Sequence, residues 1–231
     1  RQENIMIKTQ LDEVRERIEA ACLRAGRSSS ELTLIAVSKT KPVSMLKEAY
    51  DCGARAFGEH RVQELISKKP ELPEDIRWHM IGHLQRNKVS QVIGKAVLIH
   101  SVDSLRLAQQ IETEAARKGL EADILLEVNV AREESKYGFM MEEVEEAIML
   151  IKNFSHVHIK GLMTIAPFVE NPEENREIFK KLFDFAVDIG SKNIDNVTMD
   201  VLSMGMTGDY EVAIEEGATM VRVGTGIFGA R

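Results

Sequence analysis

The sequence has little of what several large classes of protein need. Only two of its 231 residues are cysteines, Cys22 and Cys52, and no CxxC spacing occurs. Two isolated thiols form neither a disulfide framework nor a zinc site, so we expect ordinary thiols of a reducing compartment. No apolar run approaches the ~20 residues that cross a bilayer, and the charged N-terminus does not have the pattern of a signal peptide. We therefore expect a cytoplasmic protein without a membrane anchor.

Basic charge is also scarce. The 37 acidic residues outnumber the 30 lysines and arginines, which gives a formal net charge of −7. Nucleic-acid binding requires a clustered basic surface, and no such cluster occurs along the chain, so no nucleic-acid partner is expected. Hydrophobic residues make up 44% of the sequence, which is enough to bury a sizeable core. No Pro/Ser-rich linker or charge block marks a boundary, so the composition predicts one domain over residues 1–231.

The apolar pattern changes along the chain from one long helix to alternating strands and helices. Residues 4–27 place apolar side chains at steps of four and three, the period of one helical face, and Gly26 is the expected end of this helix. Short apolar runs then predict strands at about 32–38, 54–58, 77–82, 96–102, 123–129, 157–164, 198–204 and 219–225. Amphipathic helical stretches separate them, for example at 44–53, 104–119 and 173–191.

Strict alternation of strands and helices implies a parallel sheet. Eight repeats at this length fit an α/β fold, a single closed (β/α)8 barrel of the TIM type preceded by the N-terminal helix. An open doubly wound sheet is the alternative arrangement.

The carboxyl ends of the last two predicted strands carry small and hydroxyl residues. In a (β/α)8 barrel, phosphate commonly binds in the loops that follow strands seven and eight. The segment LSMGMTGDYEVAI offers the Ser203 hydroxyl and two glycines, Gly205 and Gly208, that allow close approach of the backbone. The segment VRVGTGIFG provides Gly224 and Thr225 in the same way. Their joint position predicts an anion site, and plain loops are the alternative.

The first predicted strand runs directly into two lysines, in AVSKTKP. A closed barrel places this strand beside the eighth, so Lys39 comes close to a phosphate held by Ser203 and Thr225. A lysine in such a pocket is the usual nucleophile that forms a Schiff base with an aldehyde. Alternatively, Lys39 or Lys41 contacts a phosphate as a point charge, or extends to solvent. Only Lys39 is expected to point inward, because Lys41 lies beyond the strand.

Arg222 lies two residues before Gly224 and therefore on the same face of a regular strand. A buried arginine needs a partner, because an unpaired buried charge is very costly. That partner is either a ligand acceptor, such as a pyridine nitrogen, or an acid such as Asp200 or Glu127.

Six segments together resemble the family of pyridoxal phosphate homeostasis proteins: LIAVSKTKP, FGEHRVQE, WHMIGHLQRNK, ESKYGF, GLMTIAP and LSMGMTGDYEVAIEEGATMVRVGTGIFGAR. The resemblance covers nearly all of the chain. It implies the barrel of the fold-type III pyridoxal phosphate enzymes, such as alanine racemase, and a role in vitamin B6 balance.

The resemblance also implies a set of cofactor-binding residues. Lys39 matches the lysine that carries pyridoxal 5'-phosphate, and Arg222 matches the arginine that faces the ring nitrogen. The phosphate contacts are carried over to Ser203, with Met204 beside it, and to Gly224 and Thr225. The chain departs from the common family pattern at His60 and His83, which leaves the side-pocket contacts open.

Two enzymatic alternatives remain. A metal-dependent hydrolase is suggested by His79 and His83, although the HxxxH pair falls in a strand and loop and no HExxH is present. An amino-acid racemase needs a second base, which the racemases resembled here take from a tyrosine in a domain after the barrel. The three tyrosines, Tyr50, Tyr137 and Tyr210, do not lie in such a domain.

An arginine against the ring nitrogen also weakens the cofactor as an electron sink. We therefore expect a monomeric cofactor-binding protein with no catalytic residues and no metal. Pyridoxal phosphate-dependent apo-enzymes are its candidate partners.

Overall fold

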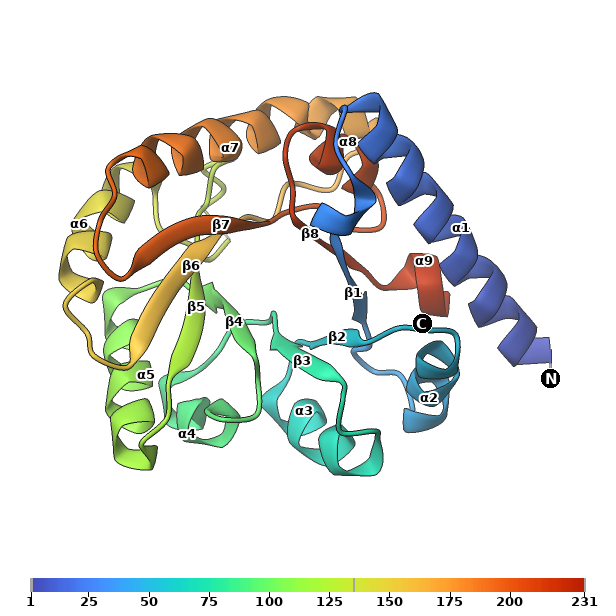
Figure 1. The fold of residues 1–231 in the computed structure, drawn as a ribbon, viewed down its shortest axis with the longest axis horizontal. Coiled ribbons are helices and arrows are strands. Elements are labelled where there is room, and N and C mark those ends of the chain that lie inside the picture. Colours follow the sequence, from blue (N-terminus) through green and yellow to red (C-terminus); the bar gives the residue numbers. More distant parts are fainter. Residues whose placement is uncertain (1, 135, 231) are drawn as a thin grey trace.

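The computed structural model describes residues 2–134 and 136–230 and forms a closed barrel of parallel strands (Figure 1). Arg1, Ser135 and Arg231, which belong to the segments considered above, lie outside the described residues. The strands are β1 Thr33–Val37, β2 Ala56–Glu59, β3 Arg77–Met80, β4 Leu98–Val102, β5 Ala122–Glu127, β6 Val157–Met163, β7 Val197–Ser203 and β8 Met220–Val223.

The first and last strands pair with each other and so close the barrel. β1 pairs with β8 in parallel over four residues, from Thr33 with Met220 to Ala36 with Val223. The predicted (β/α)8 barrel is therefore confirmed, and the open doubly wound alternative is wrong.

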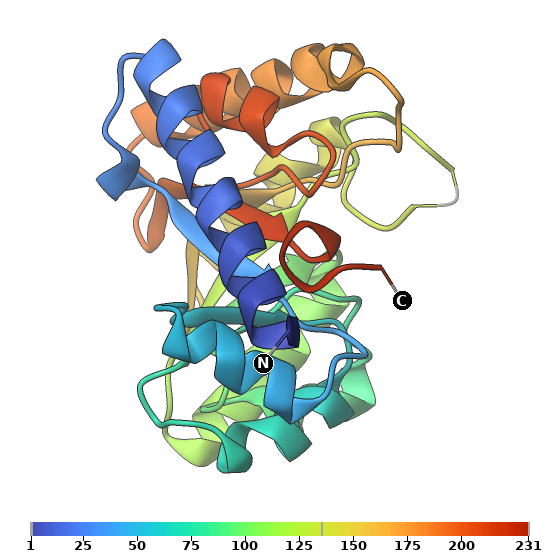
Figure 2. The same cartoon turned by 90° about the vertical axis from the view of Figure 1, so that its right-hand side faces the viewer.

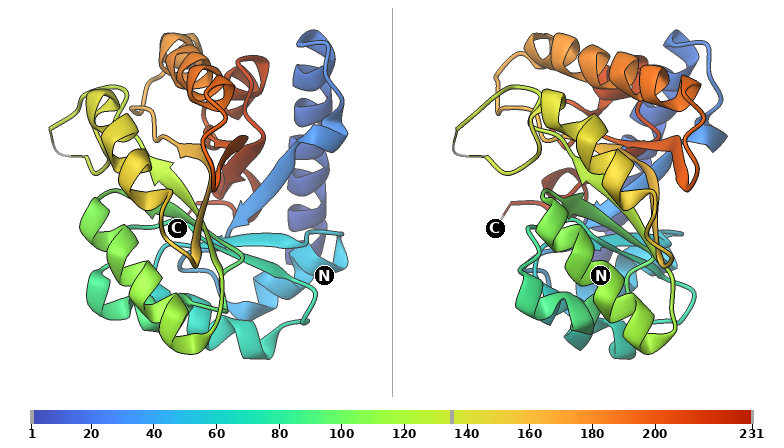
Figure 3. Two further views of the ribbon diagram at one scale, coloured as in Figure 1. Left: turned by 60° about the vertical axis from the view of Figure 1, so that its left-hand side comes forward. Right: turned by 90° about the vertical axis from the view of Figure 1, so that its left-hand side faces the viewer.

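Helices cover the outside of this barrel, and Figure 3 shows α5, α6 and α7 over the strands of its second half. The α-helices are α1 Gln2–Arg24, α2 Val43–Asp51, α3 Val62–Lys68, α4 Val89–Val92, α5 Leu105–Lys118, α6 Met141–Ile151, α7 Arg176–Ser191, α8 Tyr210–Glu215 and α9 Thr225–Phe228. Short 3-10 turns are η1 Ser29–Glu31, η2 Lys69–Glu71, η3 Arg86–Lys88 and η4 Pro172–Asn175. No helix in the described part of the chain combines the length and the apolar character needed to cross a membrane.

The N-terminal helix completes the outer layer of helices. Its apolar stripe, which includes Leu11, Val14 and Ile18, is buried. α1 packs against α2, α8 and α9, and Figure 2 shows it crossing beside α9. Because α9 has only four residues, α1 takes the outer position that a longer helix after β8 would fill.

Helix boundaries follow from capping. Ser104 accepts a hydrogen bond from the amide of Leu107 at 3.1 Å, and Gly119 ends α5 in a left-handed conformation with φ of 65°. Pro172 begins the 3-10 turn η4, and α7 follows it from Arg176.

Two predicted strands, β2 and β4, begin two residues later than expected, and β4 starts at Leu98 instead of residue 96. β2 starts at Ala56 instead of residue 54, because Gly53 has a φ of 100° and the amide of Ala54 still bonds to the carbonyl of Ala49. Gly53 and Ala54 therefore still belong to the turn that ends α2.

The carboxyl ends of the strands meet on one side of the barrel. Figure 2 shows the β5–α6 and β6–α7 connections and α9 projecting on this same side. A parallel barrel brings together the residues that follow each strand, so this carboxyl edge is where distant segments of the chain can form a site.

Candidate functional site

Lys39 lies in the turn that follows β1 and is half-buried. The carbonyl of Ser38, immediately before it, accepts hydrogen bonds from the amide of Lys41 at 3.1 Å and from Lys68 Nζ at 2.8 Å. The peptide that enters Lys39 is therefore held both by the turn itself and by a side chain of α3.

The peptide that follows Lys39 is also fixed by α3. The amide of Thr40 donates to Glu64 Oε1 at 2.8 Å, and Thr40 itself has a φ of 64°. A threonine in this left-handed conformation is strained, and surrounding contacts must hold it there. α3 therefore fixes the backbone on both sides of the lysine.

A buried ion pair supports this turn. Lys68 Nζ lies 2.9 Å and 3.1 Å from the two carboxylate oxygens of Glu59, and the Ser38 hydroxyl donates to the same carboxylate at 3.0 Å. Glu59 is fully buried, and the Lys68 side chain is 8% exposed. Burial raises the pKa of Glu59, although Lys68 acts in the opposite direction. Neither Glu59 nor Lys68 was predicted from the sequence.

The second lysine of the motif is directed elsewhere. Lys41 Nζ donates to the carbonyls of Gly229 at 3.3 Å and Ala230 at 3.2 Å. Its amine is thus tied to the C-terminal segment.

Arg222 lies inside the barrel at the end of β8 and is 4% exposed. Its Nη1 donates to Ser203 Oγ at 2.5 Å, and its Nη2 donates to the carbonyl of Thr164 at 3.0 Å. Ser203 Oγ also lies 2.9 Å from His100 Nδ1, and His100 Nε2 lies 2.9 Å from His79 Nδ1. One chain of hydrogen bonds thus joins residues of β8, β7, β4 and β3.

This chain of hydrogen bonds has one direction. Arginine can only donate, so Ser203 Oγ accepts from Arg222. A buried hydroxyl hydrogen also needs an acceptor, which His100 Nδ1 provides. His100 then carries its hydrogen on Nε2 and donates to His79. Burial lowers the pKa of His79 to about 4 and that of His100 well below its usual value, so both imidazoles are neutral near pH 7.

Arg222 forms no ion pair with any of the described residues. Neither acid considered from the sequence pairs with it: Asp200 is exposed on β7, and Glu127 attracts it only through space, as does Asp209. Burial lowers the pKa of Arg222 to about 10. A buried guanidinium without a carboxylate partner retains donors for an acceptor on a ligand.

The ends of β1 and β8 are in contact. A Cβ atom added at Gly224 would lie 3.3 Å from Val37 Cβ, so the loop that carries Gly224 and Thr225 packs directly on the end of the strand that leads to Lys39. The structure thus brings the lysine turn and the predicted anion loop to one edge.

Thr207 is a candidate site residue that was not predicted from the sequence. Its Oγ1 accepts hydrogen bonds from the amides of Gly224 and Gly226, both at 3.3 Å. These amides form a small cradle of donors aimed at an oxygen atom, which is the arrangement that a phosphate needs. The signal was present in the sequence as a hydroxyl between the glycines of MGMTG.

Two predicted phosphate residues have other contacts here. The Ser203 hydroxyl is already engaged by Arg222 and His100, and the Met204 side chain is fully buried. Their contacts with a phosphate stay predictions.

The two histidines behind the metal hypothesis lie in different surroundings. His79 is buried and bonded to His100, whereas the side chain of His83 is 38% exposed and its Nδ1 lies 3.2 Å from Asp103 Oδ2. Among residues 2–134 and 136–230, no group of three His, Cys, Asp or Glu side chains could hold a metal ion.

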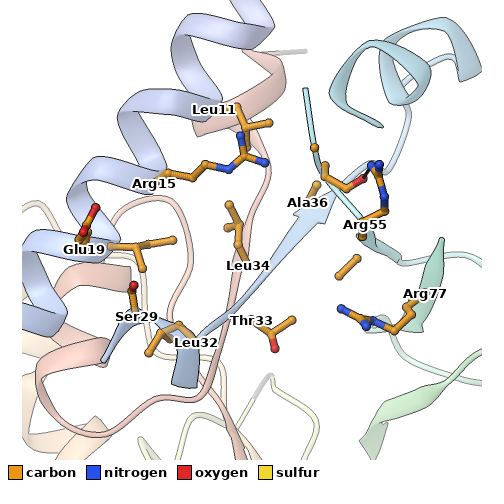
Figure 4. A pocket seen from close by; sticks show the side chains of 14 residues that line it. Leu11, Arg15, Glu19, Ser29, Leu32, Thr33, Leu34, Ala36, Arg55 and Arg77 are labelled. Atoms are coloured by element: carbon orange, nitrogen blue, oxygen red, sulfur yellow. Dashed lines mark hydrogen bonds between the residues drawn. The ribbon is translucent and has the colours of Figure 1, made fainter. Parts of the chain in front are cut away.

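A separate cavity of about 370 Å³ lies at the opposite, amino edge of the barrel (Figure 4). α1 and the first residues of β1, β2 and β3 line it, among them Arg15, Thr33 and Arg77. Its position separates it from Lys39 and the Gly224 loop.

Glu127 makes the stability of the folded protein depend on pH. Burial, reinforced by Asp103 and opposed by Arg222, raises the pKa of Glu127 to about 7 from its usual 4.5. Between these values the folded protein binds more protons than the unfolded chain, so this group lowers stability as pH rises through 7. Glu127→Gln should therefore gain up to about 3 kcal/mol in the free energy of unfolding at pH 8 and nothing near pH 4.5. Urea unfolding at both pH values measures this, and a gain that is equal at both would contradict the assignment.

The comparison with known families matches residues 10–231 to the N-terminal domain of alanine racemase, which places the chain in this class of barrel. Closer relatives narrow the class. The pyridoxal phosphate homeostasis protein of Aquifex aeolicus (strain VF5) is 46% identical over 222 residues, 96% of each chain. That of Escherichia coli (strain K12) is 38% identical over 226 residues, 96% of this chain and 95% of the relative. The chain belongs to the family of pyridoxal phosphate homeostasis proteins, as the motifs predicted.

Solved structures agree with this placement. PipY of Synechococcus elongatus PCC7942 with PLP bound is 34% identical, with a TM-score of 0.83 over 96% of this chain and all of that one. An unknown protein from Bifidobacterium adolescentis is 35% identical, with a TM-score of 0.92 over 98% of this chain and 96% of that one. Alanine racemase of Clostridium difficile 630 is 14% identical, with a TM-score of 0.74 over 98% of this chain and 57% of the enzyme, and shares the fold.

Proposed function

We propose that this chain binds pyridoxal 5'-phosphate as a Schiff base on Lys39 and takes part in the balance of this cofactor without efficient turnover. The observation that carries the proposal is the meeting of three features at the carboxyl edge. These are the fixed Lys39 turn, the buried Arg222, which pairs with no acid among the described residues, and the cradle of amides around Thr207. The PLP-bound structure of PipY and the names of the curated relatives support it.

Each chemical group of the cofactor has a matching group in this site. The amides of Gly224 and Gly226 with the hydroxyls of Thr207 and Thr225 would hold the phosphate. Arg222, which stays protonated, would donate to the ring nitrogen. When bound, the cofactor supplies an aldehyde carbon that reacts with primary amines, and Lys39 provides the amine of the chain itself.

Removing the phosphate anchors should weaken cofactor binding. Thr207→Val and Thr225→Val each delete a hydroxyl next to a charged group, worth roughly 1.5 to 3 kcal/mol, or about a tenfold to hundredfold loss in affinity. Ser203→Ala should have an effect of similar size, because it removes the acceptor that orients Arg222 or, as the family resemblance implies, a direct contact. Fluorescence titration with pyridoxal phosphate measures the affinities. Thr198→Val, an exposed threonine on β7, is the matched control. Wild-type affinity in all three site variants would contradict the proposed site.

The same site predicts little catalysis on amino acids. Racemisation needs a second positioned base, and general acid–base groups typically contribute about 10² to 10⁴ in rate. Arg222 is bonded to a serine and a carbonyl and keeps its positive charge near pH 7, so it cannot protonate the ring nitrogen effectively. We expect no appreciable exchange of the Cα hydrogen of alanine or serine in deuterated water, as followed by NMR. Rapid exchange that disappears in Lys39→Ala would make the protein a racemase-like enzyme.

We also propose that the protein is a cytoplasmic monomer that passes its cofactor to pyridoxal phosphate-dependent apo-enzymes. The acidic composition and the pair of isolated cysteines support a soluble protein of a reducing compartment. Light scattering at several concentrations tests the monomer, and transfer of cofactor to a purified apo-enzyme across a range of acceptor concentrations tests delivery.

A further inference from the structure

A second hollow lies at the carboxyl edge, between the loops that follow β2 and β3. Its volume is about 280 Å³. The lining residues are His60, Arg61, Val62, Gln63, His83, Gln85 and Lys88. None of them belongs to the proposed cofactor site, although the hollow lies next to it, because β2 is the neighbour of β1 in the barrel.

A close contact between two backbones builds this hollow. A Cβ atom added at Gly82 would lie 2.2 Å from the carbonyl oxygen of His60, so no other residue fits at position 82 without a shift of the main chain. The amide of Ile81 bonds to the carbonyl of Glu59 at 3.0 Å and continues the strand pairing up to this point. Because Gly82 has no side chain, the two loops approach closely, and His83 lines the same hollow as His60.

The charge of the hollow is one-sided. Arg61 and Lys88 both line it, and neither forms an ion pair or a side-chain hydrogen bond with any residue that the structure describes. None of the described residues that line the hollow is acidic, although the whole protein carries a formal charge of −7. Two cations that line one concave space repel each other. An anion bound between them attracts both and so offsets this repulsion.

The remaining polar groups suit the same kind of ligand. Gln63 and Gln85 each carry amide donors, and His60 and His83 carry ring nitrogens. The His83 ring stacks on Tyr137 with centroids 3.8 Å apart, and its Nδ1 faces Asp103, so the ring is held in place at the rim. At roughly 30 Å³ per water molecule, the cavity has room for a carboxylate or phosphate group and a short body.

We propose that this hollow binds the oxyanion head of a small metabolite, a carboxylate or a phosphate monoester, beside the cofactor site. Arg61 provides a planar fork for two oxygens of the ligand, and Lys88 provides a point charge. The proposal does not depend on cofactor binding, because the two sites share no residue.

Isothermal titration of the protein, with and without added pyridoxal phosphate, by inorganic phosphate and, separately, by pyruvate tests the proposal and distinguishes the two sources of the oxyanion. We expect binding of at least one of these probes at millimolar concentrations. Arg61→Gln and Lys88→Gln should each weaken it about tenfold or more, since each loses a charged hydrogen-bond donor. Arg86→Gln removes the same charge from the same loop region but does not line the hollow, so it should leave the affinity unchanged.

The outcomes separate this hollow from the cofactor site. Phosphate binding that is lost in Thr207→Val and kept in the Arg61 and Lys88 variants would belong to the amide cradle and would overturn the proposal. Equal losses of affinity in Arg61→Gln and Arg86→Gln would show that the effect comes from the overall charge of this surface. That result would also overturn the proposal. No heat with either probe up to ~10 mM would do the same. Failure of the proposed function would instead appear as absence of pyridoxal phosphate binding, with the response of the hollow intact.

Discussion

Lys39→Ala should abolish the visible absorbance that the protein gains on incubation with pyridoxal phosphate, whereas Lys41→Ala should keep it. The two lysines are two residues apart, but their surroundings differ. Lys41 donates to the carbonyls of Gly229 and Ala230, so its amine is directed to the C-terminal segment. Lys39 lies in the turn that packs next to the Gly224 loop, where a phosphate would hold the cofactor.

Borohydride reduction converts a Schiff base into a stable secondary amine, so the labelled residue can be located by digestion and mass spectrometry. We expect the pyridoxyl mass on Lys39. Lys39→Ala should still retain part of the cofactor through its phosphate, since the amide cradle does not involve the lysine. A label found mainly on Lys41, or an unchanged spectrum in Lys39→Ala, would contradict the assignment of the Schiff base to Lys39.

The fold could be predicted because its determinants are local and repeated. The strands are short apolar runs, most of them largely buried, and each is followed by a helix. The errors concern ends of elements. The strand expected from residue 54 begins at Ala56 because a left-handed Gly53 prolongs the turn before it. Such a turn depends on one backbone angle, which periodicity does not report.

The placement of candidate site residues could be predicted where they stand at strand ends, and their roles in binding stay predictions. Lys39, Gly224 and Thr225 stand at strand ends, and their positions followed from the order of strands in a barrel. The link from Arg222 through Ser203 to His100 and His79 joins four strands, and each histidine alone resembles an ordinary buried residue. Its members become connected only when the barrel closes.

The support of the lysine turn was missed for a similar reason. Lys68 is the last residue of α3, and a lysine at the end of a helix is usually expected to be exposed to solvent. In the structure it passes beneath the turn to Ser38 and Glu59. A buried lysine of this kind is recognisable only from its partner, which lies nine residues earlier in the chain.

Lys68→Met should destabilise the protein by about 3 to 5 kcal/mol, because it leaves the Glu59 carboxylate buried without its counter-charge. Glu59→Gln/Lys68→Met should recover much of this loss, since a neutral pair of similar volume no longer buries a charge. Lys69→Met, at the next position and half-buried, is the matched control and should change the free energy of unfolding by no more than about 0.5 kcal/mol. Urea unfolding monitored by circular dichroism measures all three variants.

The pH dependence and the reaction with cofactor distinguish support of the fold from positioning of Lys39. Lys68 is the main group that opposes the effect of burial on Glu59, so without it the folded-state pKa of Glu59 rises further above that of the unfolded chain. The deficit of Lys68→Met should therefore grow as pH rises above about 4.3, where the unfolded glutamate ionises. The double variant regains stability but still lacks the donor to the Ser38 carbonyl, so Schiff-base formation on Lys39 should stay slower than in the wild type. If the double variant forms the Schiff base at the wild-type rate, the ion pair supports only the fold, and the turn positions Lys39 without it.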